Sequence, residues 1–197
     1  YTGFDLELAQ AVCDMEGWEL VKTPIEWASK DAELNNGNID CIWNGFTING
    51  KEDKYEWSDP YVNNQQVVVV AKNSGIKYVA AQSASAALQL LQEGGSQEKL
   101  GKTFKEIQEF PDYNTAFSEL EAGTVDAVAM DVGVAKYQVN NRNNNYVILD
   151  ENLNSEQYGI GFKKGNTELR DKVNADLKKL YDEGKVDELA KKYGIED

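Results

Sequence analysis

The sequence contains no histidine, only two cysteines, and no apolar run of the roughly 18–20 residues that a membrane-spanning helix needs. Without histidine, the commonest general base and the commonest metal ligand are both missing, which argues against histidine-dependent or metal-dependent catalysis. Cys13 and Cys41 are too few for a zinc site. They could form one disulfide in an exported protein or remain two buried thiols.

Basic residues are also scarce, with 20 against 34 acidic residues and a formal net charge of −14. Such a surface repels nucleic acid and anionic membrane, so neither is expected as a partner. The sequence has no nucleophile elbow and no phosphate-binding glycine loop, so we expect no enzyme activity, no cofactor and no metal. What is present is a chain of 197 residues, 41% of them apolar, which suffices for one large domain or two lobes of roughly 100 residues.

Residues 34–45 and 120–131 share the pattern Leu-x-x-Gly-x-(Ile/Val)-Asp-x-(Ile/Val). Each copy predicts a helix end, a glycine in the left-handed C-cap conformation, and a short apolar strand that runs into polar residues. Because ligands gather at the carboxyl ends of strands in open α/β sheets, two similar lobes facing a shared cleft are expected. Asp40 and Asp126, just before the apolar strand residues, are interpreted as structural. The alternative is coincidence, since helix–Gly–strand is a common arrangement.

The rest of the sequence alternates between helical and strand patterns, which predicts an α/β fold. Helices are predicted at residues 4–16, 30–36, 86–91, 99–105, 114–122, 132–140, 167–182 and 186–193. Strands are predicted at residues 18–25, 39–43, 67–71, 79–81, 107–110, 125–129, 147–149 and 158–162.

Several motifs are spread over the whole chain: Gly3-Phe4-Asp5-Leu6-Glu7-Leu8-Ala9, Leu34-x-x-Gly37-x-Ile39-Asp40, Thr47-Ile48, Trp57-Ser58-Asp59-Pro60-Tyr61, Asp112-Tyr113-Asn114-Thr115-Ala116, Asp126-Ala127-Val128 and Tyr158-Gly159-Ile160. Together they resemble the polar amino-acid-binding proteins of ABC importers, solute-binding protein family 3. The resemblance implies a type II periplasmic-binding-protein fold, in which two α/β lobes are joined by a two-strand hinge. Lobe 1 would comprise residues 1–70 plus 159–197, without its usual first strand, and lobe 2 residues 71–158.

The resemblance also implies a set of ligand-binding residues. The backbone of Gly45 and the backbone and hydroxyl of Thr47 would contact the ligand's ammonium and carboxylate. Ser85 and the amide of Ala86 would donate to the carboxylate from a helix N-terminus, and Asp131 would take the ammonium. These assignments fit the physics of a zwitterion, because a buried charge must be paired and hydrogen-bonded.

Further residues complete this set. Trp27 would lie against the ligand's side chain, and Asn44 and Gln82 would line the same pocket. Where the family places an arginine that grips the carboxylate with two hydrogen bonds, this sequence has Lys51 and Glu52. Lys51 is the candidate replacement, although lysine lacks the planar fork of arginine.

Each of these residues also has a simpler interpretation. Thr47 and Ser85 could be helix caps. Trp27 could belong to the core, and Asp131 could cap the helix that follows it.

The function expected from the resemblance is capture of an amino acid or close analogue in the interlobe cleft and delivery to the membrane permease of an ABC importer. The protein would be a monomer in the periplasm or outside the cell, with any lipoprotein anchor outside this sequence. Two alternatives are the ligand-sensing domain of a receptor and a dehydratase-type enzyme on the same fold, in which Glu52 would be the candidate acid.

Overall fold

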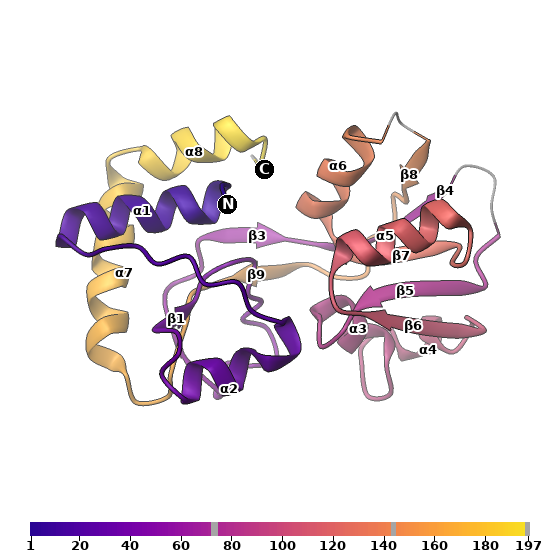
Figure 1. The fold of residues 1–197 in the computed structure, drawn as a ribbon, viewed down its shortest axis with the longest axis horizontal. Helices are drawn as coiled ribbons and strands as arrows, with labels where there is room; N and C mark the ends of the chain where they lie inside the picture. The colour runs from indigo at the N-terminus through magenta and orange to yellow at the C-terminus, as the bar shows by residue number, and fades with distance from the viewer. Residues whose placement is uncertain (72–74, 143–144, 196–197) are drawn as a thin grey trace. The chain divides into compact units, whose positions relative to one another are not determined.

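A computed structural model describes residues 1–71, 75–142 and 145–195 (Figure 1). The chain divides into two compact units. Unit 1 comprises residues 1–25, 30–63 and 157–197, and unit 2 comprises residues 26–29 and 64–156. In the described residues, no helix combines the length and the apolar composition needed to cross a membrane.

Unit 1 is a layer of helices on a small antiparallel sheet. Its helices are α1 (Phe4–Glu16), α2 (Lys30–Asn35), α7 (Thr167–Asp182) and α8 (Lys185–Tyr193). Its sheet has the order β1-β10-β2, formed by β1 (Cys41–Ile42), β10 (Gly161–Phe162) and β2 (Glu56–Trp57). The apolar face of α1 packs with β10 and with α7 and α8 through buried side chains that include Leu8, Val12, Phe162, Leu177 and Leu189. The helical spacing of Leu8 and Val12 on α1 is the pattern that sequence periodicity predicts.

Unit 2 is built on a five-stranded sheet with the order β6-β5-β7-β4-β8. The strands are β4 (Gln66–Ala71), β5 (Tyr78–Gln82), β6 (Glu106–Phe110), β7 (Ala127–Asp131) and β8 (Tyr146–Ile148). Strand β5 runs parallel to β6 and β7, whereas β4 runs antiparallel to β7 and β8. The β4–β7 register places Gln66 opposite Asp131.

Helices cover both faces of the unit 2 sheet (Figure 1). They are α3 (Ala86–Leu91), α4 (Glu98–Gly101), α5 (Tyr113–Ala122) and α6 (Val132–Asn140). Val67 and Val69 pack with α5 and α6 on one face, whereas Val68 and Val70 pack with α3 on the other. This double burial explains the unbroken valine run, because a central strand covered on both faces need not alternate with polar residues.

Two further strands, β3 (Val62–Asn64) and β9 (Glu156–Tyr158), pair with each other. The boundary between the two units falls within both of them.

The two repeated sequence stretches adopt the predicted turn. Gly37 and Gly123 both have φ of 79°, and Gly123 is the C-cap of α5. This left-handed conformation is accessible to glycine without steric cost, which explains the shared glycine of the pattern.

The predicted strand at residues 18–25 is wrong, because the structure assigns no strand there. Val21 is 71% exposed. A strand needs a neighbouring ladder for its backbone groups, and no strand in the described part of the chain pairs with this segment. The helix predicted at residues 99–105 is shorter in the structure, where α4 ends at Gly101. The strand predicted at residues 158–162 is divided between β9 and β10, and the Ile160 N–H between them donates to Ser58 Oγ at 2.9 Å.

A buried carboxyl group in unit 1 links stability to pH. Asp176 on α7 is 8% exposed and faces Glu16 at the end of α1. Burial and its contact with the Glu16 carboxyl raise the pKa of Asp176 from 3.8 to about 6, and Lys179 offsets part of this shift. Because the folded state holds the proton more tightly than the unfolded chain, the free energy of unfolding should fall as pH rises from about 4 to 6, by about 1–2 kcal/mol.

Asp176→Asn should therefore flatten this part of the stability curve and stabilise the protein at pH 7. The measurement is urea unfolding of the wild type and the variant at pH 4, 5, 6 and 7. Asp182→Asn, an exposed position on the same helix, is the matched control and should leave the curve unchanged. Parallel curves for the wild type and Asp176→Asn would contradict the assignment.

Candidate functional site

The predicted residues of unit 1 lie in the turn that follows β1. Gly45 has φ of 60°, and its N–H donates to Asp5 Oδ2 at 2.9 Å. A side chain at this position would be strained by the backbone conformation. The bond to Asp5 uses the Gly45 N–H, so the carbonyl oxygen is the backbone group of Gly45 that could contact a ligand. Asn44, beside it, is exposed.

Thr47 and Lys51 lie close together in the same turn. Thr47 is 5% exposed, and its backbone bridges to Tyr158. No helix begins at Thr47, so its interpretation as a helix cap is wrong. Lys51 Nζ lies 3.5 Å from the Thr47 carbonyl oxygen, and the Lys51 carbonyl accepts from Trp57 Nε1 at 3.0 Å. The ammonium group of Lys51 is therefore folded back onto the turn that contains Thr47.

Glu52 is engaged by the backbone of its own loop. Its Oε1 accepts from the Gly50 N–H at 3.1 Å. Hydrogen bonds from the backbone N–H of Glu52 itself and, to a smaller extent, from that of Gly50 lower the pKa of the Glu52 carboxyl. A general acid should have a raised pKa, so this geometry does not support the dehydratase interpretation.

Asp5 is a residue that sequence reasoning missed. Burial raises the pKa of its carboxyl group, while the Tyr61 hydroxyl and the Gly45 N–H lower it. Tyr61 in turn packs against Phe4, with ring centroids 6.3 Å apart. The motif Gly3-Phe4-Asp5 contained Asp5, but sequence reasoning gave it no role, because its backbone partner Gly45 lies 40 positions away.

In unit 2, Asp131 lies at the end of β7 and in the N-cap position of α6. Its side chain makes no cap hydrogen bond, so its interpretation as a cap is wrong. Instead, Asp131 Oδ1 accepts from Asn64 Nδ2 at 3.1 Å and from Gln66 Nε2. The carboxylate is therefore held by side chains from the preceding strands.

The same two amides also hold a second carboxylate. Glu156 Oε1 accepts from Asn64 Nδ2 at 2.7 Å and from Gln66 Nε2 at 2.6 Å. Glu156 Oε2 accepts from Asn154 Nδ2 at 2.8 Å. We call Asn64, Gln66, Asp131, Asn154 and Glu156 the amide network. Sequence reasoning found only Asp131, because the other members are far away in sequence and belong to no recognisable motif.

Three members of the amide network are almost completely buried: Gln66 is 0%, Glu156 4% and Asn64 6% exposed. Burying a carboxylate is unfavourable unless its oxygens are hydrogen-bonded, and here amide donors fill that role. The amide network is therefore a buried cluster of polar side chains whose hydrogen bonds offset the cost of burial.

The turn between β5 and α3 contains Gln82, Ser85 and Ala86. Ser85 Oγ accepts from the Leu88 N–H at 3.2 Å, so Ser85 is the N-cap of α3, and Ala86 is the first residue of this helix. Gln82 Nε2 donates to the Pro111 carbonyl at 3.2 Å. Ala84 has φ of 57°, an uncommon conformation for a residue with a side chain and one that often occurs near functional sites.

The hydroxyl of Tyr113, at the start of α5, interacts both with Ser85 of this turn and with the charge of Asp131. Burial and then the charge of Asp131 raise the pKa of the Tyr113 hydroxyl well above its ordinary value, and a hydrogen bond with Ser85 opposes the shift. Ser85 and Asp131 therefore lie in the neighbourhood of one tyrosine. The motif that begins at Asp112 contained Tyr113, but sequence reasoning gave it no role.

Trp27 belongs to the 3-10 helix Trp27–Ser29, which groups with unit 2. No residue of this helix is buried, so the interpretation of Trp27 as a core residue is wrong. The indole is half-buried.

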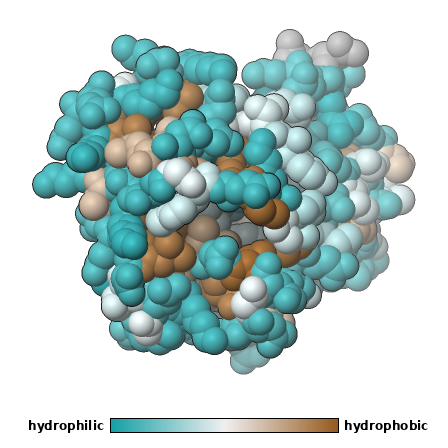
Figure 2. All heavy atoms as spheres, turned by 60° about the vertical axis from the view of Figure 1, so that its left-hand side comes forward, coloured by the Kyte–Doolittle hydropathy of each residue, from teal (hydrophilic) through white to brown (hydrophobic). Residues whose placement is uncertain are grey.

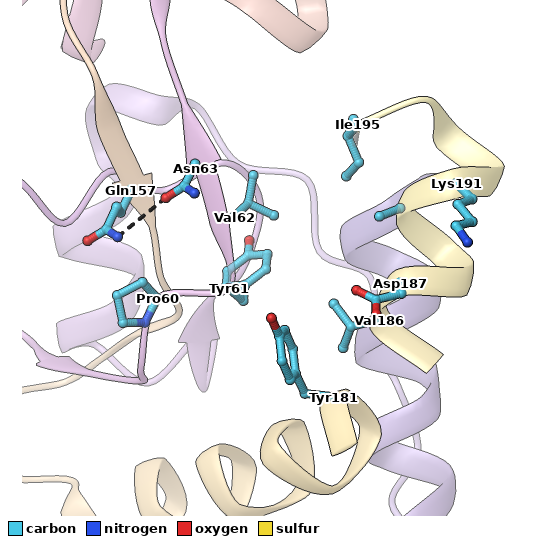
Figure 3. Close-up of a pocket in the computed structure, with 11 residues that line it drawn as sticks. Pro60, Tyr61, Val62, Asn63, Gln157, Tyr181, Val186, Asp187, Lys191 and Ile195 are labelled. Atoms are coloured by element: carbon cyan, nitrogen blue, oxygen red, sulfur yellow. Dashed lines mark hydrogen bonds between the residues drawn. The ribbon is translucent and has the colours of Figure 1, made fainter. Parts of the chain in front are cut away.

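A hollow of about 440 Å³ lies elsewhere in unit 1 (Figure 3). Its lining comes from β3, β9, α7, α8 and adjoining residues, and includes Tyr61, Gln157, Tyr181, Asp187 and Ile195. Figure 2, in which this side of the molecule comes forward, shows a mostly hydrophilic surface with hydrophobic side chains gathered around a hollow. None of the predicted ligand-binding residues lines the 440 Å³ hollow.

The cysteines of unit 1 are both free thiols in the structure. Burial and the nearby charge of Asp40 raise the pKa of Cys41 to about 12. Within the described ranges, no group of three or more potential protein ligands could hold a metal ion.

The fold agrees with comparison to known proteins. The chain belongs to the bacterial extracellular solute-binding proteins, family 3, whose family description matches residues 1–196. This result confirms the resemblance and the α/β fold of a type II periplasmic binding protein. The family consists of solute-binding proteins, and its location is outside the cytoplasm.

Individual relatives bind amino acids. The ABC transporter glutamine-binding protein GlnH of Bacillus subtilis is 32% identical over 99% of this chain and 73% of that protein. A substrate-binding protein of an ABC uptake transporter from Streptococcus pneumoniae, solved with bound histidine, has a TM-score of 0.92 and 31% identity over 100% of this chain and 85% of that chain. An ancestral arginine-binding protein bound to glutamine has a TM-score of 0.88 and 30% identity, covering 99% and 88%.

Proposed function

We propose that this protein captures an L-α-amino acid outside the cytoplasm and delivers it to the permease of an ABC importer, as a monomer and without catalysis. The observation that carries the proposal is the side chain of Asp131. It ends a buried strand, leaves its helix uncapped, and is held by two amides that can orient it toward a cationic group. A lipid anchor on such a protein would lie outside residues 1–197.

The two units would act as the two ligand-binding lobes. In unit 1, Thr47 and Lys51 would hold the ligand's carboxylate, and the Gly45 carbonyl would accept from its ammonium. The proximity of Lys51 Nζ to the Thr47 carbonyl, 3.5 Å, supports a cationic group at this turn. As a point charge, Lys51 would grip the carboxylate with less directionality than arginine.

In unit 2, Asp131 would take the ammonium, and Ser85 with the Ala86 N–H would approach the carboxylate. Trp27 would cover the ligand's side chain, a role that suits a half-buried indole. Asn44 of unit 1 and Gln82 would line the remainder of the site.

The test is isothermal titration and thermal unfolding of the intact protein with L-glutamine, L-arginine and L-histidine, followed by the other common amino acids. A ligand at a hundredfold excess over Kd should stabilise the folded state by about 2.7 kcal/mol. The N-acetyl derivative of each amino acid that binds is the control, and it should give little or no stabilisation because it lacks the ammonium. Absence of stabilisation across the panel would contradict the proposed function.

A further inference from the structure

We propose that Glu156 is a positioning residue for ligand binding: through the side-chain amides of Asn64 and Gln66, it fixes the Asp131 carboxylate in the orientation that receives the ligand's ammonium. This inference rests on the proposed function and adds to it three residues, none of which needs to touch the ligand.

Two side-chain amides of the amide network link the carboxylate of Glu156 to that of Asp131. A side-chain NH₂ group has two donors. In both Asn64 and Gln66, this group bonds to Glu156 Oε1 and to Asp131 Oδ1. Glu156 thus fixes both amides at one end, and both amides converge on a single oxygen of Asp131 at the other. Asn154 then holds the second oxygen of Glu156.

Backbone contacts also hold the amide network in place. Gln66 lies opposite Asp131 in the β4–β7 register, and the Gln66 N–H donates to Asn154 Oδ1 at 2.9 Å. Asn154 therefore bonds to the backbone of one member and the carboxylate of another. Gln66 and Asp131 are held on paired strands of the five-stranded sheet, which favours a single orientation of the side chains in the amide network.

The orientation of Gln66 indicates a function beyond stability. Its Oε1 is buried and has no hydrogen-bond partner among the described residues, an unfavourable state for a polar atom. If the amide were flipped, its oxygen would face two carboxylates, and this repulsion would cost more than leaving the oxygen without a partner. The Gln66 side chain therefore has one favourable orientation, in which its NH₂ group donates to Glu156 and Asp131.

The carboxylates of the amide network explain why it suits a cationic group of the ligand. Asp131 and Glu156 both accept hydrogen bonds from the same two neutral amides, so these donors add no positive charge of their own. These carboxylates would attract the ammonium group of a ligand, whereas they would repel a ligand's carboxylate. Loss of Glu156 should therefore weaken binding in two ways, by loosening Asp131 and by removing part of the attraction.

The experiment measures Kd by titration calorimetry with L-glutamine and L-arginine in the intact protein, together with the unfolding temperature. Glu156→Gln keeps the shape and removes the charge, and Gln66→Met keeps the length and removes the amide. Each should raise Kd by about 10-fold or more, because a hydrogen bond to a charged group is lost or weakened.

Gln138→Met is the matched control. Gln138 is also buried in unit 2, where its amide donates to Asn114 Oδ1 at 2.8 Å and accepts from Arg142 Nε at 3.0 Å, outside the amide network. This variant should lower the unfolding temperature while Kd stays within about twofold of the wild type, because its lost hydrogen bonds are structural. An equal increase in Kd for Gln138→Met, or unchanged Kd for both network variants, would overturn the inference.

A second experiment uses the wild-type protein alone, so its result does not depend on whether the variants fold. The side-chain NH₂ resonances of Asn64 and Gln66, followed by ¹⁵N NMR, should shift on saturation with the amino acid, because the ammonium changes the field at Asp131. Absence of a shift would overturn the inference even if the variants lose structure. If the wild type binds no amino acid, the proposed function fails first; if it binds and the network variants bind equally well, only the role of Glu156 fails.

Discussion

Asp131→Asn is expected to weaken binding of L-glutamine or L-arginine by at least about 100-fold, because the ligand's ammonium loses its ionised partner in a desolvated site. The substitution preserves the size of the side chain, so the loss should appear in Kd and only slightly in the unfolding temperature. Titration calorimetry of the intact protein measures the first, and a thermal scan measures the second.

Asp126 provides a control from the repeated sequence pattern. Asp126 Oδ2 accepts from the N–H groups of Lys77 and Tyr78, at 2.8 and 2.9 Å. Asp126→Asn should therefore lower the free energy of unfolding by about 1–3 kcal/mol and leave Kd unchanged. A Kd for Asp131→Asn within tenfold of the wild type would show that the ammonium binds elsewhere.

Phe117→Ala should produce the largest loss of stability, about 3–5 kcal/mol. Phe117 lies on the sheet-facing side of α5 and is 0% exposed. Its ring centroid lies 5.0 Å from that of Tyr146, in an edge-on arrangement, and 4.8 Å from the Arg142 guanidinium. Truncation removes all these contacts and leaves a cavity beneath the helix.

Urea unfolding followed by circular dichroism measures this effect. Phe117→Leu fills more of the space and should cost less than Phe117→Ala, which separates the cavity from the loss of the aromatic ring. Tyr137→Ala is the surface control, because Tyr137 on α6 is 67% exposed and its loss should change stability by less than about 0.5 kcal/mol. A loss below about 1 kcal/mol for Phe117→Ala would mean that the helix repacks around the cavity.

Local patterns in the sequence predicted much of the fold. The helical spacing of residues 4–16 coincides with α1, and the valine run identified β4. Both signals arise from neighbouring residues, so a single stretch of sequence contains them. Residues 18–25 show the opposite case, because strand formation depends on a backbone partner that the segment itself does not specify.

The candidate site was predictable only in part, for the same physical reason. Asp131 could be identified because it directly follows an apolar strand. Its hydrogen-bond partners Asn64 and Gln66 lie 65 or more positions before it. Glu156, which accepts from the same amides, lies 25 positions after it, and only the paired strands bring these residues together. The bond between Asp5 and Gly45 likewise joins residues 40 positions apart. Long-range hydrogen bonds of this kind leave no periodic trace in the sequence.

The distribution of tryptophans has an optical consequence. Trp18, Trp43 and Trp57 belong to unit 1, whereas Trp27 groups with unit 2. Intrinsic fluorescence of the protein is therefore weighted toward unit 1. With the other three indoles replaced by phenylalanine, the remaining emission would come from Trp27 alone, a single half-buried fluorophore whose spectrum depends on the polarity of its immediate surroundings.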